Sequence, residues 1–242
     1  MPLTANEKNY RATYRSVSKG VYVEDLSYWQ CIETSDIHSQ IDGSQKNSVK
    51  INISGVIYDT VQKGLECCED SSYAWLENCE HHTIAMVFFV KLSKDTFQWW
   101  CHPSRFESVM NCLSKLAQNV QHKEDLCLFS VLGPESSDRI IPKDKSEASH
   151  EKNMRINVVD MPINREKSIE SGEVFIAPVS GDKSSSEEVG AGFNVIVPNN
   201  IGYKLWLQLN HSRVFTGCLD SQEHLDVELK RLTSSKLQQD VG

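Results

Sequence analysis

The order of the secondary structure expected between residues 49 and 161 constrains the fold of this chain most. Hydrophobic patterning predicts three strands, then a helix, then two more strands. A helix between the third and fourth of five strands is the connectivity of a small Greek-key barrel. We therefore expect a chain that is mainly β with helices, built on a five-stranded barrel. In order, the expected elements are VKINISGVIYDTV (49–61), TIAMVFFVKL (83–92), TFQWWC (96–101), SRFESVMNCLSKLAQNV (104–120), DLCLFSVL (125–132) and MRINVVDM (154–161).

Local patterns support three of these elements. In 49–61 the alternation of apolar residues shifts phase after Gly55, which predicts a β-bulge in the first strand. A short turn at 93–95 joins the second and third strands, so 83–101 is expected to be a hairpin. The helix is expected to begin at Ser104, with Glu107 three residues later to complete a capping box.

The remaining sequence is expected to flank the barrel on both sides. Residues 1–48 form a polar lead-in with a strand pair, 20–26 and 27–33, followed by a loop. The polar, charged stretch 134–153 is expected to be a mobile loop between the last two barrel strands. Residues 162–242 form an additional C-terminal β segment and helix. Its expected elements are strands at 172–179, 193–198, 203–209 and 213–217, and a helix at 221–236.

Composition describes an acidic chain without a membrane segment. The 242 residues carry a formal net charge of −8, which argues against tight, autonomous binding to nucleic acid. No apolar run approaches the ~18 residues of a spanning helix, and the N-terminus lacks a signal-peptide pattern. We therefore expect no membrane contact and eight cysteines that stay reduced thiols in the nucleus or the cytoplasm.

One cluster of cysteines and histidines contains the residue types that bind zinc. Cys67, Cys79, His81 and His82 are the candidates. The chain has no C-x-x-C spacing, and the adjacent Cys67 and Cys68 cannot easily both reach one tetrahedral metal. We therefore expect no metal and no cofactor. Motifs for nucleophilic catalysis and for phosphate binding are also absent from the sequence, so we expect a protein that is not an enzyme.

A different set of residues is suited to binding a single strand or a protein partner. Trp99 and Trp100 are adjacent on one expected strand, so their side chains point to opposite faces. If Trp99 fills the core, Trp100 faces outward, where single-stranded bases stack on aromatic rings beside cations. The alternative is that Trp100 packs under a neighbouring segment. The expected binding residues around it are Gln98, Lys91, Lys94, His102 and Arg105.

The two ends of the chain add a basic arm and a docking helix. Tyr10, Arg11, Tyr14 and Arg15 alternate aromatic and basic side chains, a pattern that can lie along phosphates or can be a solvated terminus. The expected helix at 221–236 has an apolar stripe suited to a partner's groove. That stripe consists of Leu225, Leu229 and Leu232.

By element order, residues 49–161 resemble the small OB-fold subunits of single-strand-protecting complexes. These are the replication protein A type and the telomere-capping type, including the fly terminin subunits. The resemblance rests on the phase shift at Gly55, the hairpin at 83–101 and the helix at 104–120. It implies an OB-fold and association with other subunits through a C-terminal helix. In its acidic net charge the chain differs from proteins that bind single strands strongly.

We therefore expect a non-enzymatic subunit of a nuclear complex that protects DNA ends or single-stranded DNA. It would act mainly through contacts with other protein subunits, with single-stranded nucleic acid as a weakly bound further partner. The alternative is a Tudor-like interaction module in an RNA-silencing scaffold, with an aromatic cage drawn from residues 21–30 and 97–106. A zinc-dependent enzyme using residues 67–82 is the third hypothesis.

Overall fold

The structure is a computed structural model of the whole chain, and it describes the greater part of residues 15–216. The described residues are 15–37, 49–53, 55–68, 70–78, 82–143, 152–164, 169, 171–179, 191–211 and 215–216. They are mainly β with helices, as the sequence predicts, and their strands form two sheets.

The chain divides into two compact units that differ from the expected domains. One unit is continuous and spans residues 27–126, whereas the other combines residues 1–26 with 127–242. The expected barrel of 49–161 is therefore divided between the units. The expected strand pair of 20–26 and 27–33 is also separated, because these two strands belong to different sheets. The described strands form two open sheets with edge strands and not one five-stranded barrel.

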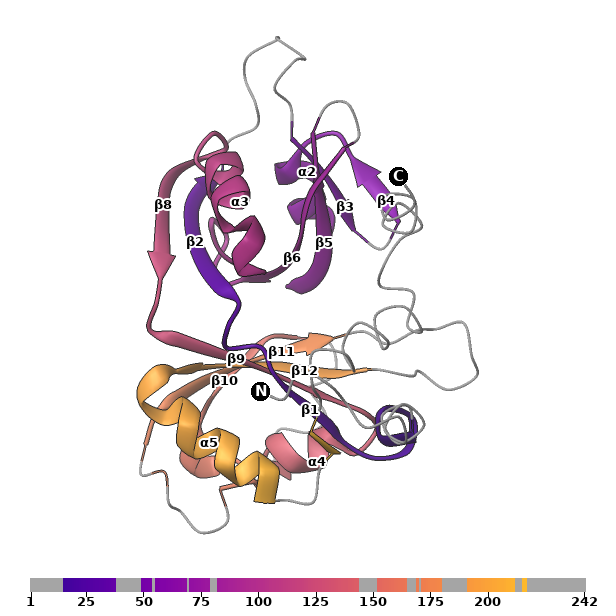
Figure 1. Cartoon of the computed structure of the whole chain (residues 1–242), viewed down its shortest axis with the longest axis vertical. Helices are drawn as coiled ribbons and strands as arrows, with labels where there is room; N and C mark the ends of the chain where they lie inside the picture. Colours follow the sequence, from indigo (N-terminus) through magenta and orange to yellow (C-terminus); the bar gives the residue numbers. More distant parts are fainter. Residues whose placement is uncertain are drawn as a thin grey trace. The chain divides into compact units, whose positions relative to one another are not determined.

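The continuous unit contains a seven-stranded sheet with the order β4-β3-β5-β6-β7-β2-β8 (Figure 1). Every neighbouring pair in it is antiparallel. The predicted hairpin at 83–101 is confirmed as β6 and β7. The strands are β2 (Gln30–Ile37), β3 (Lys50–Ile53), β4 (Val56–Tyr58), β5 (Ser71–Glu77), β6 (Thr83–Lys91), β7 (Thr96–Cys101) and β8 (Ala117–Lys123).

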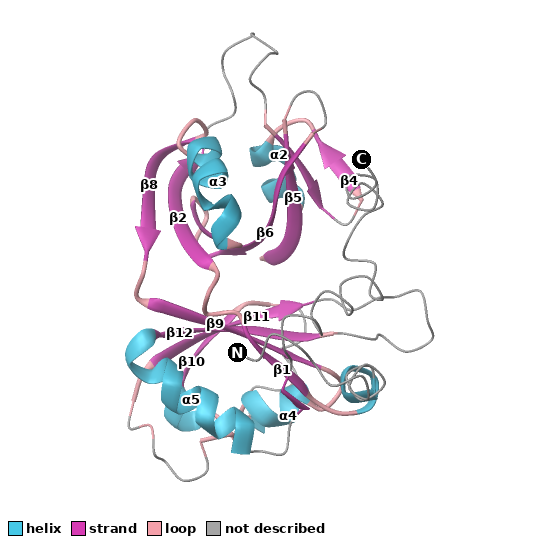
Figure 2. Cartoon of the chain, in the orientation of Figure 1, coloured by secondary structure: helices cyan, strands magenta, loops and turns pink. Residues whose placement is uncertain are grey.

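Two short helices cover one face of this sheet (Figure 2). They are α2 (Val61–Cys67) and α3 (Phe106–Leu113), and the 3₁₀ turn η2 (Pro103–Arg105) precedes α3. Alternating strand side chains point to the helices and form an apolar core with them. Trp99 lies in this core, and its indole nitrogen donates a hydrogen bond of 2.9 Å to Thr34 Oγ1.

The discontinuous unit contains a six-stranded sheet with the order β10-β11-β12-β9-β1-β13. Its first strand, β1, lies between β9 and the last described strand, β13, and pairs with β13 in parallel. The strands are β1 (Tyr22–Asp25), β9 (Leu126–Leu132), β10 (Met154–Asn157), β11 (Glu173–Val179), β12 (Gly192–Pro198) and β13 (Phe215–Thr216). Predicted strands at 125–132, 172–179 and 193–198 are thus confirmed.

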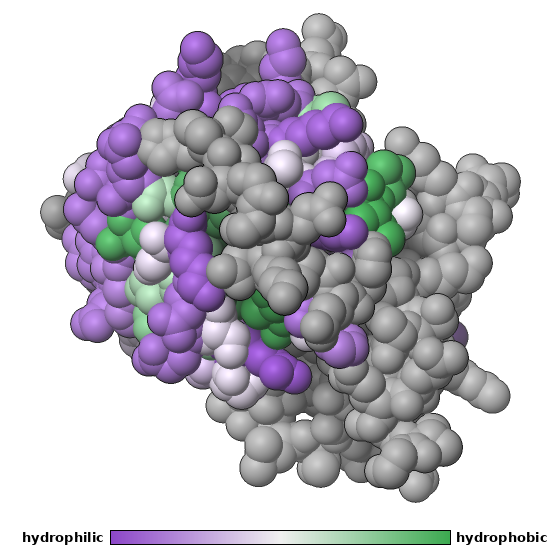
Figure 3. All heavy atoms as spheres, turned by 90° about the horizontal axis from the view of Figure 1, so that it is seen from above, coloured by the Kyte–Doolittle hydropathy of each residue, from purple (hydrophilic) through white to green (hydrophobic). Residues whose placement is uncertain are grey.

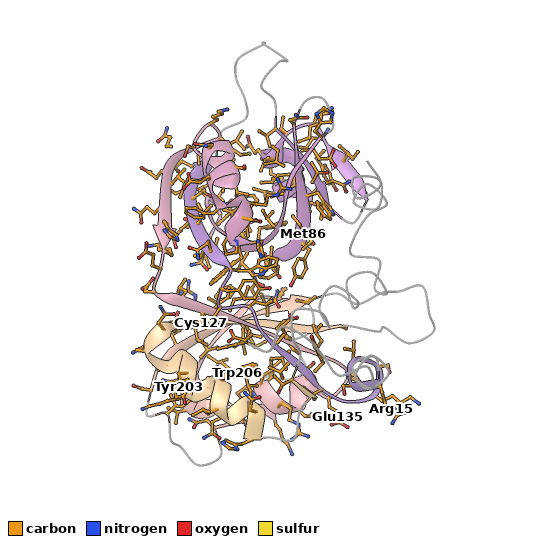
Figure 4. The ribbon with its side chains drawn as sticks, viewed as in Figure 1. Arg15, Met86, Cys127, Glu135, Tyr203 and Trp206 are labelled. Atoms are coloured by element: carbon orange, nitrogen blue, oxygen red, sulfur yellow. The ribbon has the colours of Figure 1, made fainter. Side chains whose placement is uncertain are left out.

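Helices α4 (Ser136–Ile140) and α5 (Asn199–His211) pack with this sheet. From α5, Leu205 and Leu209 are buried, and Trp206 stacks on Phe129 with ring centroids 5.7 Å apart (Figure 4). The 3₁₀ turn η4 (Val158–Asp160) follows β10 and contributes Val158 to the same core.

Several expected elements are wrong in kind or extent. Residues 49–61 contain a hairpin of β3 and β4, and Gly55, with φ of 85°, lies in its turn and not in a bulge. Residues 203–209 belong to helix α5 and not to a strand. The stretch 134–153 is not only a loop, because α4 lies within it and buries Ile140. The strand expected at 154–161 ends at Asn157, where η4 takes over.

The expected helix at 104–120 is also shorter than its pattern suggests. Helix α3 ends at Leu113, and residues from Ala117 onward form the edge strand β8. Ser104 is not its cap. The side chain of His102 instead accepts a hydrogen bond from the Ser104 backbone nitrogen and caps η2. The i, i+3 and i, i+4 spacing of Leu113, Leu116 and Val120 fits both a helix and a turn into a half-buried strand, so periodicity could not locate the boundary.

Candidate partner-binding surface

Trp100, the centre of the predicted binding site, is fully buried. It is 0% exposed and lies on the face of β7 opposite the helix-covered core, next to Cys31 in β2 and Phe88 in β6. The expectation that Trp100 faces outward is therefore wrong. The sheet is buried on both faces at this point, which explains why β6 and β7 are apolar at consecutive positions and not only at alternating ones.

Gln98 shares the face of Trp100 and belongs to a polar network at the edge of the sheet. Its amide nitrogen donates to Glu33 Oε2 over 3.3 Å, and the other oxygen of Glu33 lies 3.2 Å from Lys123 Nζ. Gln98 is 8% exposed. Since each of these side chains already has a partner, the network holds β7, β2 and β8 together and offers little to a ligand.

The four predicted cationic or imidazole side chains lie at two separate ends of β7. Lys91 and Lys94 lie at or near the turn before the strand, whereas His102 and Arg105 follow its last residue. Six extended residues span about 20 Å. The structure therefore does not assemble one basic groove, and only His102 and Arg105 remain together.

Around His102 and Arg105, four rings make two contacts within the continuous unit. The Tyr28 and His102 rings meet edge to face with centroids 5.8 Å apart. The Phe106 and His122 rings lie 4.5 Å apart. Arg105 and His102 are exposed, and Tyr28, Phe106 and His122 are partly buried. We call these five residues the ring cluster.

Hydrogen bonds fix the imidazoles of the ring cluster. His122 Nε2 lies 2.8 Å from Gln30 Oε1, and its Nδ1 lies 3.2 Å from Glu124 Oε1. His102 Nδ1 lies 2.8 Å from Ser104 Oγ. Such partners orient a ring and reduce the entropy that binding would cost.

His122 was not predicted as a site residue, whereas Tyr28 and Phe106 fall in the segments expected to form the aromatic cage of the Tudor-like alternative. Tyr28 was assigned to a lead-in strand, Phe106 to the buried face of a helix and His122 to no element. Only the pairing of β2 with β8 brings Gln30 next to His122. The single sequence signal was the aromatic residue beside an arginine at 105–106.

The continuous unit is acidic outside the ring cluster. Residues 27–126 include 13 aspartates and glutamates and eight lysines and arginines. Figure 3 shows a largely hydrophilic face with separate hydrophobic patches. Among the described residues of this unit the exposed large apolar side chains are Val56 and Ile57. This surface is better suited to a protein partner than to a phosphate backbone.

The described residues contain no cluster of three or more histidine, cysteine or acidic side chains placed to hold a metal ion. Of the zinc candidates, Cys67 and His82 are exposed, and Cys79 and His81 lie outside the described residues. Burial raises the pKa of Cys101 and of Cys112 to about 12, and it raises the pKa of Cys31 further. These three thiols stay protonated at neutral pH.

The terminal candidates fall mostly beyond the described part of the chain. Arg15 is exposed in a short helical turn, while Tyr10, Arg11 and Tyr14 lie outside the described residues. The same holds for Leu225, Leu229 and Leu232 of the expected docking helix. Within the described residues, no helix has the length and apolar character needed to cross a membrane.

Comparison with known proteins identifies a fold and no family. No protein-family model matches the chain, and no curated protein gives a significant match. Among solved structures, the glycine cleavage system aminomethyltransferase T from Bartonella henselae is similar over 94% of this chain, with a TM-score of 0.61 and 15% identity. The chain covers 56% of that enzyme, about half its length. At this identity the likeness shows a shared fold alone.

Two further structures give lower scores. The regulatory subunit of aspartate kinase from Thermus thermophilus has a TM-score of 0.36 at 12% identity, over 81% of this chain and 98% of its own. Heterotetrameric sarcosine oxidase from Corynebacterium has a TM-score of 0.35 at 9% identity, over 84% and 89%.

Proposed function

We propose that the chain is a non-enzymatic subunit of a nuclear complex that protects DNA ends or single strands. It acts mainly through protein contacts and touches the single strand weakly. The observation that carries this proposal is the ring cluster, which combines two contacts between rings with the exposed side chain of Arg105. Aromatic rings next to a cation are the elements with which proteins hold unpaired bases without reading their sequence.

Charge explains why protein contacts dominate. Non-specific affinity for nucleic acid rises with the number of phosphates that a surface neutralises. Arg105 is exposed, but Lys123 is paired with Glu33, and Lys94 lies at the far end of β7. A surface with so few cations in one place contacts one or two phosphates. A partner subunit must therefore provide most of the affinity.

Single-strand titration tests the nucleic-acid part. Fluorescence anisotropy with a labelled 20-nucleotide single strand should show weak binding by the full chain, which the double variant His102→Ala/Arg105→Ala lowers by about three- to tenfold. The slope of log K against log salt should also fall by about 1. Lys94→Ala, which removes an exposed cation away from the ring cluster, is the matched control and should change little.

Equal affinities for the wild type and the double variant would refute this assignment of the surface. The protein part is tested separately by purifying the tagged full chain from nuclear extract with and without nuclease. Subunits held by protein contacts stay bound after nuclease treatment. If every associated protein is lost with the nucleic acid, the claim that protein contacts dominate fails.

One contact supports the Tudor-like alternative, which can also be tested. The contact between Tyr28 and His102 joins the two segments that were expected to form an aromatic cage. However, Trp29, Trp99 and Trp100 in those segments are buried, with exposures of 5%, 0% and 0%. A peptide with dimethylated arginine should therefore bind no better than its unmethylated form. A clear preference for the methylated peptide would replace our proposal with the alternative.

A further inference from the structure

Strand β8 is the longest edge strand in the described part of the chain. It has seven residues and pairs with β2, and no described strand lies on its other side (Figure 1). The other edge strands have three residues in β4, four in β10 and two in β13. An edge of seven residues is about 24 Å long and presents a row of backbone donors and acceptors.

β8 lacks the features that protect the edges of most sheets. Edge strands are commonly blocked by proline, by outward charges or by a bulge. β8 has no proline, and its single charged residue is Lys123 at its last position, which is occupied by Glu33. Its pairing with β2 is regular from Asn119 to Lys123. Asp36 of β2, which has φ of 57°, is not paired with Gln118, so the regular edge on which a further strand can add is Asn119–Lys123.

The side chains of β8 are polar and uncharged over most of its length. Gln118, Asn119 and Gln121 are exposed, and Val120 and His122 are partly buried. Asn119 Nδ2 donates to Ser35 Oγ over 3.2 Å, which orients that amide on the sheet. Amide side chains pair with each other across strands without a net charge.

We propose that two copies of this chain associate through antiparallel pairing of their β8 strands, with the two-fold axis at Val120. This register centres the two strands on each other, because Val120 is the middle of the seven residues of β8. Asn119 lies opposite Gln121 of the second copy, and Gln118 lies opposite His122. The two Val120 side chains meet, and Lys123 lies opposite Ala117.

Charge favours a second copy over a charged partner at this edge. In the proposed register no like charges lie opposite each other, and each amide faces an amide or an imidazole. The isologous arrangement uses the same surface on both copies, which gives a closed dimer. The result would be a continuous sheet across two chains. This proposal does not depend on the binding of a single strand.

Sedimentation equilibrium of the full chain tests the proposal through two matched variants. Asn119→Lys/Gln121→Lys places lysines opposite each other twice in the dimer and should weaken association at least tenfold. Asn119→Glu/Gln121→Lys places opposite charges at the same two positions and should restore association to within about threefold of the wild type. Both positions are exposed, and circular dichroism verifies that each variant is folded.

Three outcomes would overturn the proposal. The first is a wild-type chain that stays monomeric up to 100 µM. The second is a pair of variants that associate equally, because the register requires them to differ. The third concerns the opposite edge of the same sheet, where Val56→Lys/Ile57→Lys alters the exposed residues of β4. If that variant removes association and the β8 variants do not, β4 and not β8 forms the contact.

Discussion

The two sheets of this protein are assembled from the chain in opposite ways. The seven-stranded sheet is built entirely from residues 27–126, with a core of aromatic and aliphatic side chains. The six-stranded sheet joins residues near the N-terminus to residues from Leu126 onward, and β1 lies between β9 and β13. Its pairing therefore spans nearly 200 residues, from Tyr22 to Phe215.

The two sheets therefore depend on different parts of the chain. Closing a long loop costs entropy that must be offset by contacts formed only after closure. The seven-stranded sheet has shorter loops to close, so its stability depends mainly on its own packing. The six-stranded sheet depends on a four-residue strand from the N-terminal segment.

Deleting residues 1–26 should have the largest effect, which is loss of the six-stranded sheet. The deletion removes Tyr22 and Val23, both fully buried between neighbouring strands. Hydrogen exchange with mass spectrometry should show amides after 127 losing protection, while amides in 27–126 keep it. Deletion of residues 1–14 is the control and should leave both sheets protected. Equal loss of protection in both units would contradict the contrast.

Raising the pH above 9 should destabilise the seven-stranded sheet. Cys31 and Cys101 lie in its strands and Cys112 lies in helix α3 packed on it, and burial raises their pKa values from an ordinary 9.0, to about 12 for the last two. The folded chain then holds protons that the unfolded chain has released, so stability falls as pH rises. By pH 9.5 the loss is about 1 kcal/mol for each thiol.

Urea denaturation at pH 7 and pH 9.5 measures this loss. The triple variant in which alanine replaces the three cysteines is the control, since it removes the groups that titrate. A pH dependence that survives in this variant would show that other groups cause it.

Substituting Asn164 should destabilise the six-stranded unit by about 2 kcal/mol. Its buried amide nitrogen donates to the carbonyl of Ile169 over 2.9 Å, and its oxygen accepts from the backbone nitrogen of the same residue over 3.3 Å. Asn164→Ala leaves these backbone groups buried without a partner. Thermal denaturation measures the stability of both variants. Asn157→Ala changes an exposed position in the same unit and should lower the stability less than Asn164→Ala.

The two adjacent tryptophans should respond differently to the same substitution. Trp99→Phe removes a hydrogen bond to Thr34, whereas the indole nitrogen of Trp100 has no hydrogen-bond partner among the described residues. We expect Trp99→Phe to cost about 1 to 1.5 kcal/mol more than Trp100→Phe in urea denaturation. Adding Thr34→Val to both variants should remove most of that difference.

Breaking the ion pair between Lys123 and Glu33 should have the smallest effect. The two side chains are 31% and 26% exposed, so solvent screens their attraction. Lys123→Ala should lower the stability of the seven-stranded sheet by about 0.5 kcal/mol. A loss above 2 kcal/mol in urea denaturation would mean that this network supports the edge of the sheet more than its exposure suggests.

Sequence patterning predicted the local elements better than their assembly. The hairpin of β6 and β7 was predicted because β-branched and aromatic residues flank a short polar turn. Helix α5 was mistaken for a strand, since YKLWLQL alternates apolar and polar residues and also places Leu205 and Leu209 one turn apart. Only the contact of those leucines with the six-stranded sheet selects the helix.

The candidate site shows the same limit. His102 and Arg105 were predicted from residue type, and they do lie together. Trp100 was misplaced because alternation assigns it a face but does not tell whether that face is covered. His122 was missed and Tyr28 was not placed next to His102, because these contacts join residues far apart in the sequence, Tyr28 with His102 across 74 residues and His122 with Gln30 across 92.

The sequence by itself determined that this chain is acidic, mainly β and without a catalytic motif, because these properties follow from composition and short-range pattern. Tertiary contacts select which strands are neighbours, place β1 in the six-stranded sheet, bury Trp100 and leave β8 at the edge of its sheet. The physical reason is that strand pairing joins distant residues through backbone groups that every sequence has. Side-chain patterns therefore predict strands, and only the folded chain selects their partners.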